Sequence, residues 1–325
     1  MSAVTLRPAA LRLGSRRSPM AIAQSRQVAS MITERTGRPV EIAGVTTLGD
    51  VSRAQLTQIG GTGVFVSALR EALLGGEVDL AVHSLKDLPT GPAAGNALAA
   101  VPARDDPRDA LVARDGAKLA DLPAGARIGT GSPRRAAQLL GLRADLRCVP
   151  IRGNAGTRLG KVSEGELDAV VLAYAGLARI GRVGAVTQVF EPDEMLPAPG
   201  QGALAVECRA GDAELSALLQ AVTDETSMAA VTAERSLLEA LEAGCSAPIG
   251  AYAAVAPGQP GHLRLQAAVM SPDGSRGLRA HGGSPAAAAW QLGRDLAAEL
   301  LRSGASDLIS GPEERVNSRN DVSER

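Results

Sequence analysis

Residues 127–158 form the most chemically distinctive stretch of the 325-residue sequence. They include seven arginines, no lysine and a single carboxylate. Ser132 and Pro133 are typical of a helix N-cap and a first helical residue, which would place Arg134 and Arg135 in the first turn of that helix. Such a concentration of guanidinium groups indicates a site for negatively charged groups.

Positive side chains are unfavourable in the first turn of a helix, because the positive end of the helix dipole lies there. The conflict is relieved if an anion binds at the same point, held by free backbone N–H groups and by guanidinium groups. Asn154 repeats the arrangement, with Arg152 before it and Arg158 in the following turn. We therefore hypothesise a cleft for a ligand with several carboxylates or phosphates. The alternative is a solvated basic face, but such a face rarely places arginines against the dipole at two helix starts.

Composition argues against several other classes of protein. The chain has 34 basic and 35 acidic residues and only 2% aromatic residues, so we expect no nucleic acid partner. Three cysteines without paired spacing argue against a disulfide framework or a zinc site, and we expect no metal. No apolar run is long enough for a membrane span and nothing resembles a secretory signal, so we expect a cytoplasmic protein without a membrane partner.

The chain alternates between strand-like and helix-like segments. Strands are predicted at residues 11–14, 40–45, 78–83, 203–208, 249–256 and 263–270. Helices are predicted after the Ser18–Pro19 cap, over residues 64–74 and 224–243, and from about Ser284 to Ser303. The glycine-rich segment 46–63 is predicted to be a mobile loop, and the polar residues 311–325 to be disordered.

A weak internal repeat relates two parts of the chain. Residues 76–88 align without gaps with residues 165–177, and residues 11–24 resemble residues 126–138 after a one-residue shift. The shared order of strand, capped helix and strand predicts two similar α/β lobes that face one another.

The repeat also serves as a control, because residues shared by both copies are structural and a difference marks an added function. Lys86 and Asp87 stand opposite Ala175 and Gly176. The first copy thus has a charged pair at the end of a buried strand, which is where open α/β sheets bind ligands. Asp87 could stabilise a cation or accept and return a proton, whereas in a purely structural role it would only pair with an arginine.

Two proline-bearing segments, 101–109 and 196–202, are predicted to cross between the lobes and to form a hinge beside a ligand cleft. The predicted fold class is α/β with three domains, of which the first two are lobes facing a cleft and the third is a small α/β domain. The expected boundaries are 1–102 with 201–221 for the first lobe, 103–200 for the second, 222–310 for the C-terminal domain and 311–325 for the tail.

Cys245 follows a glycine that ends a predicted helix, in the sequence AGCSAPIG. A helix C-terminus raises the pKa of a thiol, which argues against an activated nucleophile and favours a covalent attachment point. The alternative is an ordinary small residue in a turn. His83 stands next to Ser84, a combination that could suggest a hydrolase. No GxSxG motif is present and His83 belongs to a predicted strand, so a structural role is expected for it.

Several strings occur together in a fixed order: LRLGSRRSPMA, GGTGVFVSALREALL, AVHSLKDLP, ARDDPRDA, GTGSPRR, PIRGNAGTR, LPAPGQGALAVECR and EAGCSAPIG. With these strings the chain resembles the porphobilinogen deaminase (hydroxymethylbilane synthase) family from Leu11 to about Ile309. The resemblance implies a transferase of heme and porphyrin biosynthesis, monomeric and cytoplasmic, whose first two domains are like the lobes of periplasmic binding proteins.

The resemblance also implies a dipyrromethane cofactor, joined to Cys245 by a thioether and made from two substrate molecules. This cofactor primes the addition of four molecules of porphobilinogen, each of which loses ammonia to give an azafulvene-type cation. Hydrolysis then releases the linear tetrapyrrole hydroxymethylbilane, and the primer stays attached.

Every pyrrole unit carries an acetate and a propionate, with which arginine forms planar paired hydrogen bonds. By match to the family positions, carboxylates are expected to be held by Arg16, Arg134, Arg135, Arg152, Arg158 and Arg179, with hydroxyl donors from Ser18, Thr130 and Ser132. Lys86 is expected to bind a cofactor carboxylate. Asp87 is expected to contact the pyrrole N–H groups and to stabilise the positive charge as ammonia leaves. Gln24 and Gln201 are expected beside the cleft.

Segment 46–63 departs from the common family pattern. Many relatives have lysine where this chain has Gln58 and Thr62, and arginine where it has Leu48, so this loop is expected to contribute less positive charge.

Two other functions compete with the deaminase. A non-catalytic two-lobed protein that binds an organic anion would explain the arginines and the hinge, but not Lys86, Asp87 or Cys245. A phosphoribosyltransferase would need a pyrophosphate loop and magnesium carboxylates, and neither is evident.

Overall fold

The computed structural model describes residues 10–45, 63–242 and 247–309. By its internal contacts the chain divides into two compact units. Unit 1 comprises residues 1–104 and 203–228, and unit 2 comprises residues 105–202 and 229–325. Each unit is described by itself below. No helix among the described residues is both long and apolar enough to cross a membrane.

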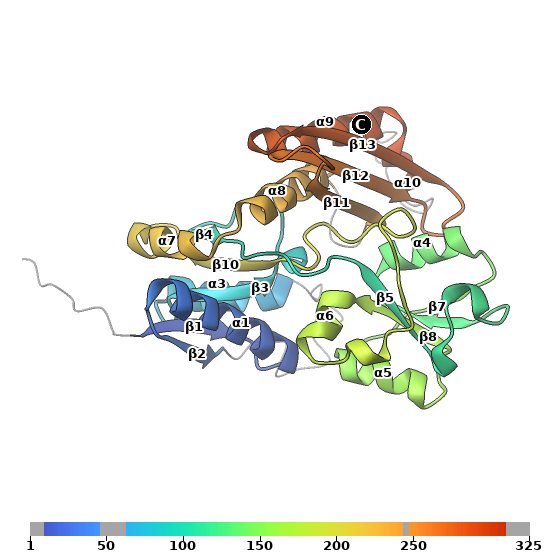
Figure 1. Ribbon diagram of the computed structural model, residues 1–325, viewed down its shortest axis with the longest axis horizontal. Coiled ribbons are helices and arrows are strands. Elements are labelled where there is room, and N and C mark those ends of the chain that lie inside the picture. The colour runs from blue at the N-terminus through green and yellow to red at the C-terminus, as the bar shows by residue number, and fades with distance from the viewer. Residues whose placement is uncertain (1–9, 46–62, 243–246, 310–325) are drawn as a thin grey trace, which may run out of the picture. The chain divides into compact units, whose positions relative to one another are not determined.

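Unit 1 is built on a five-stranded sheet with the strand order β2-β1-β3-β10-β4 (Figure 1). Its strands are β1 (Leu11–Ser15), β2 (Val40–Gly44), β3 (Leu80–Ser84), β4 (Asn96–Ala100) and β10 (Leu204–Arg209). Its helices are α1 (Pro19–Thr36), α3 (Gly63–Leu74) and α7 (Ala213–Leu219). Successive strand residues point to opposite faces, so Leu80 packs in the core beneath α1 and Ala81 in the core beneath α3.

The predicted cap of the first helix is confirmed. Ser18 is the N-cap of α1, where its Oγ accepts a hydrogen bond from the Ala21 N–H at 3.2 Å, and Pro19 is the first helical residue. At the other end Gly37 has φ +69°, a left-handed conformation that glycine adopts without steric cost. These local signals therefore set both ends of the helix.

Unit 2 contains a second five-stranded sheet, with the order β7-β6-β8-β5-β9. Its strands are β5 (Asp109–Ala113), β6 (Arg127–Gly129), β7 (Arg147–Val149), β8 (Ala169–Ala173) and β9 (Gln188–Val189). Its helices are α4 (Pro133–Leu142), α5 (Ala155–Ser163) and α6 (Tyr174–Arg179). The predicted caps are confirmed, because Ser132 accepts from the Arg135 N–H and Asn154 from the Thr157 N–H.

The two sheets are copies of one pattern, as the sequence repeat predicts. In each, three parallel strands are followed by one antiparallel strand and then by an edge strand. The pairing of Leu13 with Leu80 recurs as Ile128 with Ala169. Gly76 and Gly165, at matching positions, have φ values of +71° and +79°. The repeat therefore extends to register and turn geometry.

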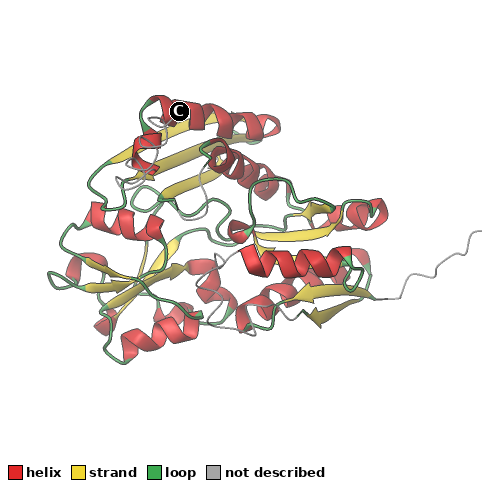
Figure 2. Ribbon diagram, turned by 180° about the vertical axis from the view of Figure 1, so that it is seen from behind, coloured by secondary structure: helices red, strands yellow, loops and turns green. Residues whose placement is uncertain are grey.

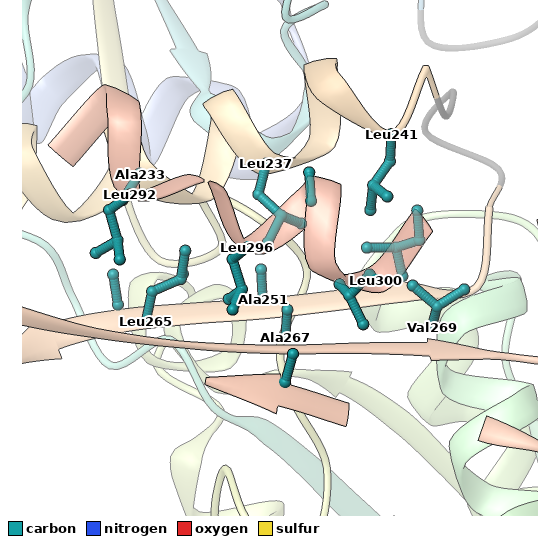
Figure 3. Packing of buried hydrophobic residues seen from close by; sticks show 14 of the residues in the cluster. Ala233, Leu237, Leu241, Ala251, Leu265, Ala267, Val269, Leu292, Leu296 and Leu300 are labelled. Carbon is teal, nitrogen blue, oxygen red and sulfur yellow. The ribbon is translucent and has the colours of Figure 1, made fainter. Parts of the chain in front are cut away.

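The rest of unit 2 is a three-stranded antiparallel sheet with helices against it (Figure 2). The strands are β11 (Ile249–Val255), β12 (His262–Met270) and β13 (Gly277–Pro285), and the helices are α9 (Ala289–Arg302) and α10 (Ala305–Ile309). Helix α8 (Glu225–Ala240) begins in unit 1 and continues into this part. Figure 3 shows leucines of α8 and α9, such as Leu237 and Leu296, pointing at Leu265 and Ala267 of β12.

The prediction of a helix from about Ser284 was wrong at its start. Residues 277–285 form β13, which pairs with β12 over its whole length, and α9 begins only at Ala289. Three glycines in this segment lower its strand propensity, which hid the strand from sequence reasoning. One of them has a packing reason, because a Cβ at Gly282 would lie 3.2 Å from Leu292 Cδ1 of α9.

We predict that Gly293→Ala will destabilise the protein although alanine is the better helix former. A Cβ at this position would lie 2.3 Å from the Ala233 carbonyl oxygen and 2.7 Å from the Leu237 nitrogen, so α8 and α9 would have to separate. Overpacking of this kind costs about 1–3 kcal/mol, more than the roughly 1 kcal/mol gained in helix propensity. Urea unfolding measures the difference.

The control is Ala298→Gly on the exposed side of the same helix, which should lose only the propensity difference of about 1 kcal/mol. If Gly293→Ala proved as stable as the unmodified protein, the close approach of α8 and α9 would be wrong.

Candidate functional site

The predicted site residues of each unit gather at one edge of its sheet. In unit 2 the segments that follow β6, β7 and β8 carry Thr130, Arg152 and Arg179 respectively. These three strands are parallel, so their carboxyl ends share an edge. In unit 1 the parallel strands β1 and β3 likewise end beside one another, and Arg16 and Lys86 follow them. Each unit therefore has the strand-end edge at which open α/β sheets bind ligands.

An ion cluster occupies the edge of unit 2, where α4 begins. Asp109, the first residue of β5, is fully buried, and Arg134 and Arg135 are 3% and 6% exposed. Arg134 Nη1 lies 2.7 Å from Asp109 Oδ2. Arg135 donates from Nε to Asp109 Oδ1 at 2.9 Å. The solvated basic face is therefore wrong for these two arginines.

Gln201 connects this cluster to a second segment of unit 2. Its Nε2 donates to Asp109 Oδ1 at 2.9 Å and to the Pro107 carbonyl at 2.7 Å, and its Oε1 accepts from Arg135 Nη2 at 3.3 Å. Arg134 also donates from Nη1 to the Leu196 carbonyl at 2.6 Å. The two predicted crossover segments are thus held together by side chains that were predicted to bind ligands.

Burial and charge act in opposite directions on the cluster. Burial alone would raise the pKa of Asp109, but the charges of Arg134 and Arg135 outweigh it and hold that pKa well below its usual range. Burial lowers the pKa of Arg134 and of Arg158, and the charge of Arg135 lowers both further. Asp109 therefore stays ionised, and the arginines repel one another.

The cluster fits an anionic ligand with several carboxylates. Arg134, Arg135 and Arg158 bring three positive charges against the one negative charge of Asp109, so an excess of positive charge remains. Arg134 Nε is buried and has no hydrogen-bond partner among the described residues. An unsatisfied buried donor is costly, and a carboxylate would satisfy it and neutralise the excess charge.

The sequence repeat shows that the fold does not need this cluster. Arg134 and Arg135 correspond to Met20 and Ala21 of α1, and Asp109 corresponds to Leu204 of β10. Unit 1 therefore has apolar side chains where unit 2 has three charges. Because both sheets have the same topology, the charges are an addition made for another purpose.

Arg179 lies in a second ion pair of unit 2. Its Nε donates to Asp105 Oδ2 at 2.9 Å and its Nη2 donates to the Gly202 carbonyl at 2.7 Å. Gly202 has φ +87°, and a Cβ there would lie 2.5 Å from the Asp105 carbonyl oxygen. Only glycine allows this approach, which joins the two crossover segments at a further point.

The start of α5 carries the remaining basic residues. Asn154 caps the helix through a 2.9 Å hydrogen bond from the Thr157 N–H. Arg158 is half-buried and donates from Nε to the Gly153 carbonyl at 2.9 Å, while Arg152 is exposed. Arg152 is therefore the arginine of this group that water reaches most easily.

In unit 1 the charged pair predicted at the end of β3 lies in a single 3₁₀ turn, Leu85–Asp87. Lys86 and Asp87 are both half-buried. Gln24 is buried in α1 and donates from Nε2 to Ser84 Oγ at 2.7 Å, directly before the turn. Of the predicted residues, Gln24 is thus brought to the turn that carries Asp87, and Arg16, half-buried, follows the neighbouring strand β1.

Sequence reasoning missed two carboxylates, Asp109 and Glu207, each buried in a strand beside arginine. The aligned parts of the repeat do not include Asp109, and its match with Leu204 is visible only from strand pairing. Glu207 stood out as the charged residue of the run ALAVEC.

Cys245 and the loop residues Leu48, Gln58 and Thr62 lie outside the described residues. Among the residues described, no group of three or more His, Cys, Asp or Glu could hold a metal ion.

We predict that Asp109→Ala will destabilise the protein by about 3–5 kcal/mol, because it leaves Arg134 and Arg135 buried without their counter-charge. Urea unfolding measures this loss. The matched control is the triple variant Asp109→Leu, Arg134→Met and Arg135→Ala, which gives unit 2 the residues of unit 1. The triple variant should be more stable than Asp109→Ala, and the reverse order would contradict the ion cluster.

Comparison with solved structures finds proteins of low sequence identity. The methionine binding protein MetQ has a TM-score of 0.42 and 12% identity, over 66% of this chain and 90% of that one. The VFT2 domain of BvgS from Bordetella pertussis has a TM-score of 0.41 and 19% identity, over 66% of this chain and 85% of that one.

Comparison with known sequences gives much stronger matches. The family description "Porphobilinogen deaminase, dipyromethane cofactor binding domain" matches residues 11–217, and "Porphobilinogen deaminase, C-terminal domain" matches residues 228–302. Porphobilinogen deaminase of Thermobifida fusca is 61% identical over 307 residues, covering 92% of this chain and 95% of that protein. Porphobilinogen deaminase 1 of Streptomyces coelicolor is 57% identical over 310 residues, covering 92% and 97%. The chain therefore belongs to the porphobilinogen deaminase family.

Proposed function

We propose that the protein is a hydroxymethylbilane synthase, a transferase of heme and porphyrin biosynthesis. It joins four molecules of porphobilinogen to a dipyrromethane primer and releases the linear tetrapyrrole by hydrolysis. Family membership over most of the chain supports this activity. The structural observation that carries the proposal is the arginine cluster around Asp109, because its excess positive charge suits a ligand with several carboxylates.

The side chains of unit 2 bind carboxylates in this proposal. Arg134, Arg135 and Arg158 hold acetate and propionate groups of the cofactor and the growing chain, with Arg152 and Arg179 acting on substrate units. Thr130 and Ser132 donate hydroxyl hydrogen bonds beside them, and Gln201 holds Arg135 in place. Asp109 fixes Arg134 and Arg135 in one orientation, so little rotamer entropy is lost when a carboxylate binds.

The side chains of unit 1 carry out the chemistry. Asp87 lies in a turn anchored at the end of β3, and we assign to it the stabilisation of the cation that forms when porphobilinogen loses ammonia. It can also accept the proton that the pyrrole carbon releases after the new bond forms. Lys86 binds a cofactor carboxylate. Arg16, Ser18 and Gln24 bind substrate carboxylates or support the turn.

The cofactor supplies the free pyrrole carbon to which the first substrate molecule is joined. We assign its attachment to Cys245 through a thioether. The other two thiols are poorer candidates, because Cys208 is fully buried in β10 and Cys148 is half-buried in β7. An attached cofactor needs open space beside its cysteine, which a position inside a packed sheet does not offer.

The domain boundaries are part of the proposal. We assign 1–102 with 201–221 to the first lobe, 103–200 to the second and 222–310 to the C-terminal domain, leaving 311–325 as a tail. We also propose that the protein functions as a cytoplasmic monomer without a nucleic acid partner. The near-balanced charge and low aromatic content support this last point.

We predict that purified protein will carry a covalent adduct with the mass of a dipyrromethane, and that Cys245→Ser will abolish the adduct. Intact mass under denaturing conditions gives the result directly. Cys148→Ser is the control, and it should keep the adduct. An adduct on the Cys245→Ser variant would refute this attachment point.

We predict that Asp87→Ala will lower kcat at least 100-fold, because general acid–base and charge-stabilising groups contribute effects of about 10² or more. The assay is steady-state formation of hydroxymethylbilane. Glu77→Ala removes an exposed carboxylate from the same unit and should keep normal turnover. A near-normal kcat for Asp87→Ala would remove this residue from the mechanism.

A further inference from the structure

A second buried ion cluster lies in unit 1, apart from the residues assigned above. Glu207 of β10 is 2% exposed and accepts two hydrogen bonds from Arg70 of α3, from Nη2 at 2.7 Å and from Nε at 3.0 Å. His83 Nε2, on β3, lies 3.2 Å from Glu207 Oε2. We call Arg70, His83 and Glu207 the β3 triplet.

The electrostatics of the β3 triplet favour an ionised carboxylate. Burial by itself would raise the pKa of Glu207, but the hydrogen bonds and charges of His83 and Arg70 outweigh it and lower that pKa to about 2. The pair of Arg70 and Glu207 has two parallel hydrogen bonds, the arrangement that fixes orientation best. The triplet therefore holds α3, β3 and β10 in one register.

The repeat again provides an internal comparison, because unit 2 has apolar residues at all three positions. Leu159, Leu172 and Val112 correspond to Arg70, His83 and Glu207. In unit 2 these three side chains belong to one hydrophobic cluster beneath α5. The same sheet topology thus forms with an apolar core at this place.

Energetics argue against stability as the reason for the triplet. Replacing a buried ion pair by well-packed apolar residues is often neutral or stabilising, because ions lose their hydration on burial. What a buried ion pair with two parallel hydrogen bonds does provide is a unique arrangement of the elements that it joins. The lobe that carries the triplet is also the lobe that carries Asp87.

The triplet acts on the strand that leads to Asp87. His83 is four residues before Asp87, and Ser84 accepts the hydrogen bond from Gln24. The backbone N–H of Leu85 donates to the Ala203 carbonyl at 3.0 Å, and the equivalent bond in unit 2 runs from Tyr174 to Arg108. The backbone anchor is therefore common to both lobes, whereas the side-chain anchors belong to the lobe with the catalytic turn.

We propose that Arg70, His83 and Glu207 are positioning residues for the deaminase reaction, which fix the end of β3 so that Asp87 is held in its reactive orientation. This inference rests on the proposed function of Asp87. It predicts an effect on the chemical step and little effect on substrate affinity, because none of the three is assigned to the substrate.

The test is the apolar variant Arg70→Leu, His83→Leu and Glu207→Val, which copies the residues of unit 2. Full-length protein is purified, its cofactor content is measured by intact mass, and kcat and KM are determined with porphobilinogen. We expect a folded, fully loaded protein whose kcat falls about tenfold while KM changes less than about twofold. A kcat equal to that of the unmodified protein would overturn the inference.

Two further measurements keep the test decisive. If the triple variant does not fold, the single variant His83→Leu replaces it, because it leaves the Arg70–Glu207 pair in place. This variant should lower kcat about threefold at unchanged KM. An unchanged kcat in His83→Leu would also overturn the inference. Asp79→Asn is the control, since the Arg12–Asp79 pair recurs in unit 2 as Arg127–Asp168 and is structural. It should lower the unfolding temperature without changing kcat. An inactive unmodified protein would refute the proposed function and this inference with it.

Discussion

The arrangement of the second lobe depends on one buried interaction, in which the carboxylate of Asp109 neutralises part of the charge of Arg134 and Arg135. Two guanidinium groups could not be buried at the start of a helix without a counter-charge. A single carboxylate makes burial possible but leaves the region positive. The two guanidinium groups are therefore held by hydrogen bonds and ion pairs to Asp109, and an excess of positive charge remains that an anion would neutralise. That combination of fixed donors and unsatisfied charge is what recognition of a carboxylate-rich chain requires.

Gene duplication of a lobe would explain how such features were added to one stable framework. Both sheets keep the same strand order, the same pairing and the same left-handed glycine, whereas each copy has its own buried ion cluster. The cluster of the first lobe lies beneath α3, and that of the second lies where α4 begins. In both cases the other copy has apolar residues at the matching positions. The same sheet topology thus forms with either charged or apolar side chains at these positions, and the charged ones differ between the two lobes.

Local sequence signals predicted the parts of the fold that depend on backbone chemistry. Such signals predicted the caps at Ser18, Ser132 and Asn154, the duplicated lobes and the strand at β10. Strand β13 was missed because its three glycines lower its strand propensity, although Gly282 allows close packing against α9, a tertiary reason that propensity does not contain. The partner of Arg134 and Arg135 was also missed. A bound anion was expected beside these arginines, but the carboxylate of Asp109 supplies part of the negative charge. Asp109 is 25 residues before Arg134 and 26 before Arg135, and only strand pairing brings it close to them.

The most direct test is a crystal structure of the protein with its cofactor attached, at a resolution that places carboxylate oxygens. The account predicts cofactor carboxylates within about 3 Å of the guanidinium nitrogens of Arg134 and Arg135, while both arginines keep their contacts with Asp109. Cofactor carboxylates that face only water, with these two arginines bound to Asp109 alone, would contradict it.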